Sequence, residues 1–590
     1  MGLFNSPRRG ALLRSPREIV REGRSLQVPR PRHAPRDPDG VYPAQREELM
    51  PIALASLVLA FLALLICTVR GWLLLYGDAV AHLGIARRIL DARYPGLAQL
   101  GGVWLPLPHL LMAPFAQRMD WWQSGLAGAF PSMAAYLFAV VGCYKLARRL
   151  VSAPWSFAAT AFFALNPNML YLSTTAMTEP LFLALLIWST ILALETVDAL
   201  REGKAYVAGT RMLYSGVVTL AMVLTRYDGW IVGAVVWVVI ALAWYRSEPR
   251  IRDKSQTALI VMTLLALAGP ALWLSYNAVY QHDWLDFLRG PYSAAAIERK
   301  TTPPGAQHYR GWHNPLWALI YYVRTAQADA AAWETGFALT LAAAWGAWLL
   351  WKRKAMRIVL LLWLPLPFYV YSLAWGSVPI FIPQIYAHAY YNTRYGMELL
   401  PALAIGTVCA LAWLFDRVKP TRPKLAEGIY FASLLLIVLN GIAMMGTVGT
   451  VLERVTGHTP EWLAAPPLVF QEGVVNSRTR IPFERMLARE LLHAPPGSII
   501  MIDTTDHIGA VQTAGLSLKS LISPLDSQSF DRAKEAPARY ANLVIALDGD
   551  PVAKAVAAHP EGLAEIEILC QTGQPCAHLY RSDSITAGGR

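Results

Sequence analysis

Long apolar segments recur along this chain, and they constrain its fold more than any other feature of the sequence. Stretches of about 18 to 24 mostly apolar residues are long enough, as helices, to cross a hydrocarbon layer about 30 Å thick. Apolar residues make up 55% of the chain and charged residues only 16%, whereas about a quarter of a soluble domain is charged. The sequence therefore predicts a mainly α-helical, polytopic membrane protein.

We expect about eleven membrane-spanning helices. Basic residues gather in alternate connections between them, which by the positive-inside rule places these connections and the N-terminus in the cytoplasm. The net charge of +12 then reflects orientation in the membrane and does not indicate a nucleic-acid partner. The expected spans are roughly residues 51–75, 126–144, 155–172, 179–197, 209–225, 230–245, 257–280, 335–351, 356–375, 396–415 and 427–449.

The composition changes twice along the chain and so suggests three regions. Residues 1–50 are rich in arginine and proline and predict a disordered, basic cytoplasmic tail. Residues 51–450 form the membrane domain, with a first outer loop at 77–125 and a long outer loop at 281–334. Residues 451–590 predict a small extracytoplasmic α/β domain, because the apolar runs SIIMID and LVIALD each end in Asp, as buried strands do.

The five cysteines show no C-x-x-C or metal-finger spacing. Cys67, Cys143 and Cys409 lie within or beside expected spans. Cys570 and Cys576 are the only plausible disulfide pair.

The first outer loop opens with the sequence GDAVAH, which places a single acid where the chain leaves the membrane. Asp78 and His82 are four residues apart, so in a helix they share one face. We expect this helix to lie at the membrane surface with both groups facing water. Two plainer readings remain open, in which Asp78 caps the helix and His82 is a half-buried interfacial residue. Arg87 and Arg88 are expected to contact lipid phosphates.

Other charged residues lie at the outer ends of expected spans. Glu179 lies in the segment TTAMTEPLF, Arg226 and Asp228 lie in LTRYDGW, and Arg394 lies in YYNTRYGMELLP. Spanning a bilayer does not require charges at these positions, and charged groups in or near hydrocarbon are costly. They are expected either to form a functional site or to pair with one another.

These residues together resemble the GT-C superfamily of integral-membrane glycosyltransferases. The resemblance rests on the acid opening the first outer loop, the MTEPLF and TRYDGW turns, and RYG-x-x-x-L-P at a late span. It covers about residues 50–450 and is strongest to bacterial relatives of protein mannosyltransferases and lipid A aminoarabinose transferases. Such enzymes transfer a sugar from a polyprenyl-phosphate carrier to an acceptor on the outer face, with inversion. Members often carry two adjacent acids in this loop, whereas here Gly77 and Ala79 flank the single Asp78.

The resemblance implies roles for the residues at these positions. An inverting transfer needs a carboxylate to take the acceptor's proton, and Asp78 is the candidate general base. Guanidinium groups match phosphate geometry, so Arg394 and Arg226 are candidates for binding the donor phosphate. The remaining candidate substrate-binding residues are Tyr395, Glu179, Asp228 and His82.

No cofactor is expected, and a divalent metal has little support. His282, His308, His313 and His388 lie on outer loops, but their spacings match no standard metal site. The segment IDTTDH at 502–507 follows an expected strand without a glycine-rich phosphate loop, so we expect a positioning or acceptor-docking role there.

The aromatic residues of the outer loops predict contacts with the membrane boundary and the site. We expect the long loop 281–334 to be either a mobile cover over the site or a disordered connection. Tryptophans at the outer boundaries predict an aromatic belt, with some stacking on sugar. They are Trp104, Trp121, Trp122, Trp284, Trp312 and Trp333.

Alternative functions remain open at this stage. One is oligosaccharide transfer from a lipid pyrophosphate, although the chain lacks a WWDYG-like motif. Another is a transporter or flippase of lipid-linked glycans, which would place acids or helix breaks near span midpoints. A third is an inactive envelope scaffold. The preferred reading is a hexosyl- or pentosyltransferase of a bacterial inner membrane, acting among membrane lipids on a protein, lipid or glycan acceptor.

Overall fold

The computed structural model describes residues 44–302, 305, 307–386, 389–446, 457 and 467–582. The chain divides into two units, residues 1–41 and 42–590, and the description that follows concerns the second. Most of the predicted tail lies outside the described residues. The last part of the predicted tail, from Arg46 on, is helical and belongs to α1 (Arg46–Arg70). Gln45 and Glu48 form a capping box at the start of this helix.

The described residues contain nine helical segments long and apolar enough to cross a membrane, so this is an integral membrane protein. They correspond to nine of the eleven expected spans. The most buried is α8, with 78% of its apolar window inside the protein, whereas α18 has only 11% buried. The bundle is therefore built around α8, and α18 presents apolar residues outward. The nine are α1, α5 (Leu126–Arg148), α8 (Glu179–Arg201), α9 (Ala205–Val223), α10 (Asp228–Tyr245), α11 (Pro249–Tyr280), η2 with α16 (Lys354–Trp363 and Pro365–Trp375), η3 with α17 (Thr393–Leu399 and Leu400–Val418) and α18 (Pro423–Met444).

The expected span 155–172 is instead two short helices, α6 (Ala153–Ala164) and α7 (Pro167–Leu172). The break occurs because Asn166 caps α7, with its side-chain oxygen accepting a hydrogen bond from the Met169 amide at 3.1 Å. The Asn166 side-chain nitrogen donates to the Asp329 carbonyl at 2.8 Å. Side-chain bonds thus compensate for the interrupted helix.

The expected span 335–351 is one helix, α15 (Thr335–Lys352), but it is not among the nine apolar segments. It packs closely against α17 through small residues. A Cβ atom added to Gly346 would lie 1.8 Å from the Gly406 carbonyl oxygen. Glycine at this position permits the two backbones to touch, as in other membrane helix pairs.

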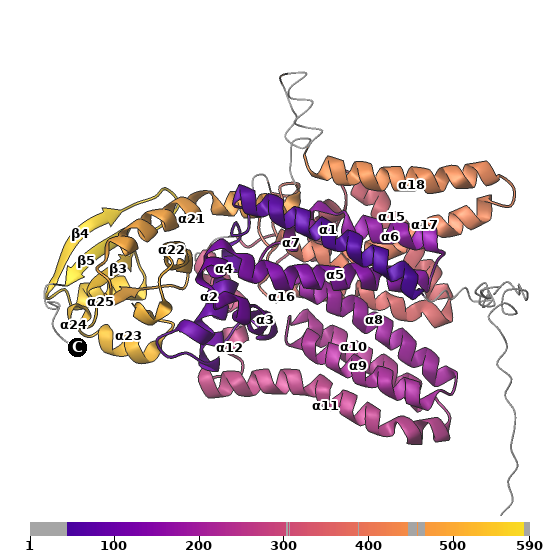
Figure 1. The fold of residues 1–590 in the computed structure, drawn as a ribbon, viewed down its shortest axis with the longest axis horizontal. Helices are drawn as coiled ribbons and strands as arrows, with labels where there is room; N and C mark the ends of the chain where they lie inside the picture. The colour runs from indigo at the N-terminus through magenta and orange to yellow at the C-terminus, as the bar shows by residue number, and fades with distance from the viewer. Residues whose placement is uncertain are drawn as a thin grey trace, which may run out of the picture. The chain divides into compact units, whose positions relative to one another are not determined.

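Short helices cover one end of the bundle, between it and the C-terminal sheet (Figure 1). The helix that carries Asp78, α2, packs against α3 and α22, and most of its residues are buried. A Cβ atom at Gly84 would lie 3.0 Å from Ile508 of α22. The expectation that both Asp78 and His82 face water is therefore wrong for His82, which is buried, whereas the Asp78 side chain stays partly exposed. These helices are α2 (Gly77–Asp91), η1 (Leu97–Leu100), α3 (Leu107–Ala116), α4 (Met119–Ser124), α12 (Asp286–Arg289) and α13 (Ala294–Thr301).

The described part of the long loop 281–334 is largely structured. It contains α12, α13 and the longer α14 (Pro315–Ala330), which begins at an Asn314 cap. Tyr321, Tyr322 and Asp329 of α14 are buried. The reading of this segment as a disordered connection is wrong for these residues, since α14 belongs to the packed interior.

The C-terminal region consists of a long helix, α21 (Leu468–His493), and a five-stranded sheet. The strand order is β2-β1-β3-β5-β4, with β1 parallel to β2 and β3, and β5 antiparallel to β3 and β4. Both predicted strands are confirmed as β1 and β3, and a helix, α25 (Pro551–Ala558), follows the second of them. Two further strands, β4 and β5, which add antiparallel pairing to the sheet, were not predicted from the sequence. The strands are β1 (Ile500–Ile502), β2 (Leu521–Ile522), β3 (Leu543–Leu547), β4 (Leu563–Leu569) and β5 (Ala577–Ser582).

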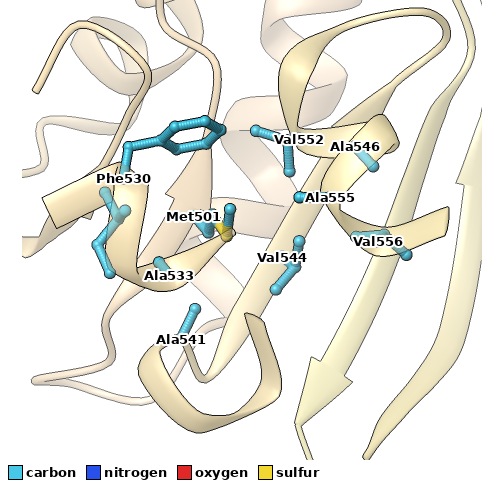
Figure 2. Close-up of a cluster of buried hydrophobic side chains, with 10 residues drawn as sticks. Met501, Phe530, Ala533, Ala541, Val544, Ala546, Val552, Ala555 and Val556 are labelled. Carbon is cyan, nitrogen blue, oxygen red and sulfur yellow. The ribbon is translucent and has the colours of Figure 1, made fainter. Parts of the chain in front are cut away.

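A compact apolar core stabilises one face of this sheet (Figure 2). Met501 and Val544 of neighbouring strands pack with Phe530 and Val552 from helices. The predicted disulfide between Cys570 and Cys576 is present and links β4 to β5. The helices of this region are α22 (Ile508–Ala514), η4 (Leu518–Ser520), α23 (Ser527–Ala533), α24 (Pro537–Tyr540) and α25 (Pro551–Ala558).

The carboxyl group of Glu484 in α21 makes stability depend on pH. Burial raises its pKa from 4.5 to about 7, although the Arg480 guanidinium 2.6 Å away opposes the rise. The folded protein therefore holds this proton more tightly than the unfolded chain. We predict that this contribution, roughly 3 kcal/mol, is fully present below pH 4.5 and is lost as the pH rises to about 7.

Thermal unfolding of the purified full chain between pH 4.5 and 8 tests this prediction. Glu484→Gln should flatten the decline in Tm with rising pH. The control Glu490→Gln, on the same helix, should keep the wild-type slope. Equal slopes for wild type and Glu484→Gln would contradict the assignment.

Candidate active site

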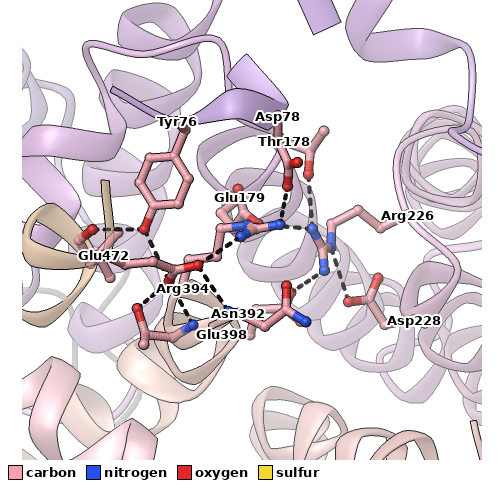
Figure 3. Close-up of polar contacts among 12 residues, drawn as sticks. Tyr76, Asp78, Thr178, Glu179, Arg226, Asp228, Asn392, Arg394, Glu398 and Glu472 are labelled. Atoms are coloured by element: carbon pink, nitrogen blue, oxygen red, sulfur yellow. Dashed lines mark hydrogen bonds and ion pairs between the residues drawn. The ribbon is translucent and has the colours of Figure 1, made fainter. Parts of the chain in front are cut away.

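Charged residues from distant parts of the chain meet in one cluster (Figure 3). Asp78 comes from the first turn of α2, and Glu179 and Asp228 are the first residues of α8 and α10. Arg226 lies just before α10, and Arg394 belongs to η3. The structure thus brings together the acids and arginines that the sequence placed at outer span ends.

Arg394 connects three carboxylates. One terminal nitrogen contacts Asp78, Nε donates to Glu179 Oε1 at 3.2 Å, and Nη1 lies 3.5 Å from Glu472 Oε1. The guanidinium also lies 5.5 Å from the centre of the Tyr76 ring. These contacts use three of its five N–H groups, and the other two have no acceptor among the described residues.

Arg226 is more completely enclosed. Nη1 donates to Thr178 at 2.8 Å and to Glu179 Oε1 at 3.0 Å, and Nε donates to Asp228 at 3.1 Å. Its Nη2 donates to the Tyr369 hydroxyl at 2.6 Å and lies 3.0 Å from Glu398. All five N–H groups therefore face an acceptor within the protein.

Two shared neighbours hold the guanidinium groups together. Glu179 Oε1 accepts a hydrogen bond from each arginine. The Tyr395 ring lies 5.0 Å from the Arg394 guanidinium and 5.1 Å from that of Arg226. A carboxylate and an aromatic face thereby offset the repulsion between two buried cations.

Asp78 differs from the other acids of the cluster in its exposure. Its side chain is 38% exposed, whereas the side chains of Glu179 and Asp228 are each 1% exposed and that of Glu398 is 0% exposed. The capping role considered for Asp78 is wrong, since Tyr76 is the N-cap residue and no side chain caps α2. Asp78 is thus a paired carboxylate that solvent can still reach.

Several members of this cluster were not identified from sequence. Glu398 lies within the RYGMELLP motif, four residues after Arg394, so helical spacing could have revealed it. The Tyr369 hydroxyl donates to Glu398 at 2.8 Å and lies 3.2 Å from Asp228, but nothing in the sequence marks it among other aromatic residues. Glu472 lies beyond the membrane domain, and only the fold brings it here.

His82 lies near this cluster but is buried rather than interfacial. Its Nδ1 lies 2.8 Å from Nε2 of His109, and its ring packs in a tilted arrangement against Trp104, with the ring centres 4.3 Å apart. Burial, together with the positive charges of Arg394 and Arg226, lowers the pKa of His82 to about 3. The imidazole is therefore neutral at physiological pH.

Two other expectations for the outer loops need correction. Arg87 does not face lipid phosphates, because it is buried, pairs with Asp91 at 2.7 Å and donates to the Ala116 carbonyl at 2.8 Å. Its neighbour Arg88 donates to the Gln99 carbonyl at 3.3 Å. Trp122 is fully buried and does not belong to an aromatic belt.

Within the described residues, no group of three or more histidine, cysteine or acidic side chains could hold a metal ion. His308 pairs with Glu298 at 2.7 Å and stacks on Trp312 at 4.4 Å. His388 lies outside the described residues.

Comparison with solved structures identifies the architecture. The chain is similar to ArnT from Cupriavidus metallidurans bound to undecaprenyl phosphate, with a TM-score of 0.50, 14% sequence identity, and coverage of 93% of this chain and 100% of that one. ArnT is a lipid A aminoarabinose transferase of the GT-C superfamily. The chain has a GT-C fold.

Two further structures with this fold align less closely. ArnT from the same organism in the apo state gives a TM-score of 0.47 at 14% identity, over 89% of this chain and 98% of that one. An Archaeoglobus fulgidus oligosaccharyltransferase tethered to an acceptor peptide gives 0.39 at 12% identity, over 92% and 74%. No family model and no curated protein sequence matches the chain. The GT-C resemblance predicted from sequence is thus confirmed at the level of the fold.

Arg226 provides a direct test of the buried cluster. Replacing it with Gln would leave Glu179, Asp228 and Glu398 without their shared cation. Removing one partner of a buried ion pair costs about 3–5 kcal/mol, so we predict a large loss of folded protein. The fraction of monodisperse protein in detergent and its Tm measure this loss.

Arg201→Gln is the matched control, because this guanidinium is 53% exposed and lies 3.8 Å from its acidic neighbour. It should leave both readouts unchanged. Adding Glu398→Gln to Arg226→Gln should restore part of the stability by removing one unpaired charge. Equal stability of Arg226→Gln and wild type would mean that the cluster does not hold the bundle together.

Proposed function

We propose that this protein is a membrane glycosyltransferase that transfers a sugar from a polyprenyl-phosphate donor to an acceptor on the extracytoplasmic face. The observation that carries the proposal is the partly exposed Asp78 carboxylate, held by Arg394 within a buried charge cluster. The GT-C fold supports it, since a solved structure with this fold contains undecaprenyl phosphate. The N-terminus is cytoplasmic in this proposal, and the membrane is a bacterial inner membrane.

In the proposed reaction Asp78 is the general base. The acceptor hydroxyl attacks the anomeric carbon on the face opposite the phosphate and gives its proton to the Asp78 carboxylate. The bond between that carbon and the phosphate oxygen breaks, and its electron pair leaves with the polyprenyl phosphate. The products are the glycosylated acceptor with inverted configuration and the lipid phosphate.

The two arginines take different roles in this proposal. Arg394 has two N–H groups without an acceptor in the cluster, so it is suited to bind the oxygens of the departing phosphate. The N–H groups of Arg226 are already engaged, and it instead supports Glu179 and Asp228. Tyr395 supports both guanidinium groups from one side. The neutral His82, one helical turn after Asp78 in α2, contributes to substrate binding.

The charge balance of the cluster also favours glycosyl transfer. Five carboxylates, those of Asp78, Glu179, Asp228, Glu398 and Glu472, surround two guanidinium groups. Glycosyl transfer passes through a centre with oxocarbenium character, whose positive charge such a site would stabilise. The same arrangement does not favour a transporter, because Glu179 and Asp228 lie at helix starts and not at span midpoints.

Asp78→Asn tests the role of the base. We predict that it lowers transfer by about 10²–10⁴-fold while the protein stays folded and retains its donor. The assay uses membranes containing the full chain, radiolabelled polyprenyl-phosphate sugars and an acceptor extract. Donor binding is measured separately with the purified protein.

Asp120→Asn is the matched control, since this acid is 61% exposed and pairs only with Arg118 among the described residues. It should transfer sugar at the wild-type rate. Undiminished transfer by Asp78→Asn would remove the proposed base. Absence of transfer by the wild-type protein from every lipid-phosphate sugar would overturn the proposed reaction.

A further inference from the structure

The helix α21, which precedes the C-terminal sheet, enters the charge cluster through Glu472. Its carboxylate accepts hydrogen bonds from the backbone amides of Asn392 and Thr393 at 2.9 and 2.8 Å, and from the Thr393 hydroxyl at 2.6 Å. It also lies 3.2 Å from the Tyr76 hydroxyl oxygen and 3.5 Å from Nη1 of Arg394. Glu472 is buried, so these contacts satisfy a carboxylate that water does not reach.

These contacts fix the backbone directly before Arg394. Asn392 has a φ angle of 54°, a conformation that residues other than glycine rarely adopt. Its amide and that of Thr393 both point to Glu472. The carboxylate therefore stabilises the turn from which the Arg394 side chain extends (Figure 3).

The same helix fixes the backbone directly before Asp78. Arg480, two turns further along α21, donates to the carbonyls of Leu74 and Leu75 at 2.7 and 3.1 Å. The Tyr76 hydroxyl donates to the Val469 carbonyl of α21 at 2.7 Å. One helix thus holds the segments before both members of the Asp78–Arg394 pair.

We infer that α21 is a positioning element for the reaction, with Glu472 aligning Arg394 and Arg480 aligning Asp78. This inference rests on the proposed function, because it assigns α21 to the geometry of the proposed base and phosphate ligand. It gives the C-terminal region a second role besides any contact with the acceptor. Neither Glu472 nor Arg480 touches the reacting atoms in this account.

In the full-length protein, Glu472→Gln tests the alignment of Arg394 and Arg480→Lys tests the alignment of Asp78. Each should lower the rate of sugar transfer from preloaded donor, measured in a single turnover, by about tenfold or more. The reason is that a small displacement of a catalytic group slows a reaction steeply. The donor Kd should change by less than about threefold, since the donor site itself stays in place. Measuring the rate per bound donor removes any contribution from a smaller folded fraction.

A double variant distinguishes positioning from general destabilisation. Substitutions at residues that position the same pair of groups give non-additive effects. The fold-loss of transfer rate in Glu472→Gln/Arg480→Lys should therefore be smaller than the product of the two single fold-losses. Thr393→Val, which removes one hydroxyl contact, gives a milder loss of rate and keeps the test valid if Glu472→Gln does not fold. The control Glu490→Gln, whose carboxylate pairs with His493 on the same helix, should keep the wild-type rate.

A wild-type rate per bound donor in Glu472→Gln, Arg480→Lys and Thr393→Val would overturn the inference. Multiplicative losses in the double variant would also overturn it. Either result, obtained while Asp78→Asn still abolishes transfer, leaves the proposed function intact. If the proposed function is wrong, the wild-type protein itself will not transfer sugar.

Discussion

The structure depends on one shared carboxylate oxygen. Glu179 Oε1 accepts hydrogen bonds from both Arg226 and Arg394, which come from the turn before α10 and from η3. Two buried cations would otherwise repel one another and lack counter-charges. The shared acid joins α8, α10 and η3 at one point, and Arg394 then fixes Asp78 on α2. The convergence of these helices and the chemistry of the site thus have a common physical origin.

The membrane explains why this cluster lies at helix ends. A charged side chain in the middle of a span would have to be desolvated by hydrocarbon, which is costly. At the first residues of α8 and α10, the acids Glu179 and Asp228 instead benefit from the positive end of the helix dipole. Helix starts at the bilayer edge can therefore hold a dense charge cluster, and protein covers it from outside through α2 and α21.

The sequence predicted the parts of this arrangement that local patterns determine. Apolar length predicted the spans, and the position of Asp78, Glu179, Asp228 and Arg394 at span ends predicted their meeting. The break in 155–172 was missed because an Asn cap followed by Pro competes with a strongly apolar pattern. Glu472 could not have been found, since its role depends on a contact between residues 78 positions apart in sequence and on how α21 docks.

The most direct measurement is a cryo-EM structure of the full-length protein in lipid with polyprenyl phosphate bound. We predict the phosphate beside Arg394, within hydrogen-bonding distance of the Arg394 N–H groups that have no acceptor among the described residues, with the Asp78 carboxylate facing the space next to it. We also predict Arg226 unchanged in its contacts with Glu179 and Asp228. A phosphate bound away from Arg394, or an Asp78 carboxylate directed into acyl chains, would contradict the account.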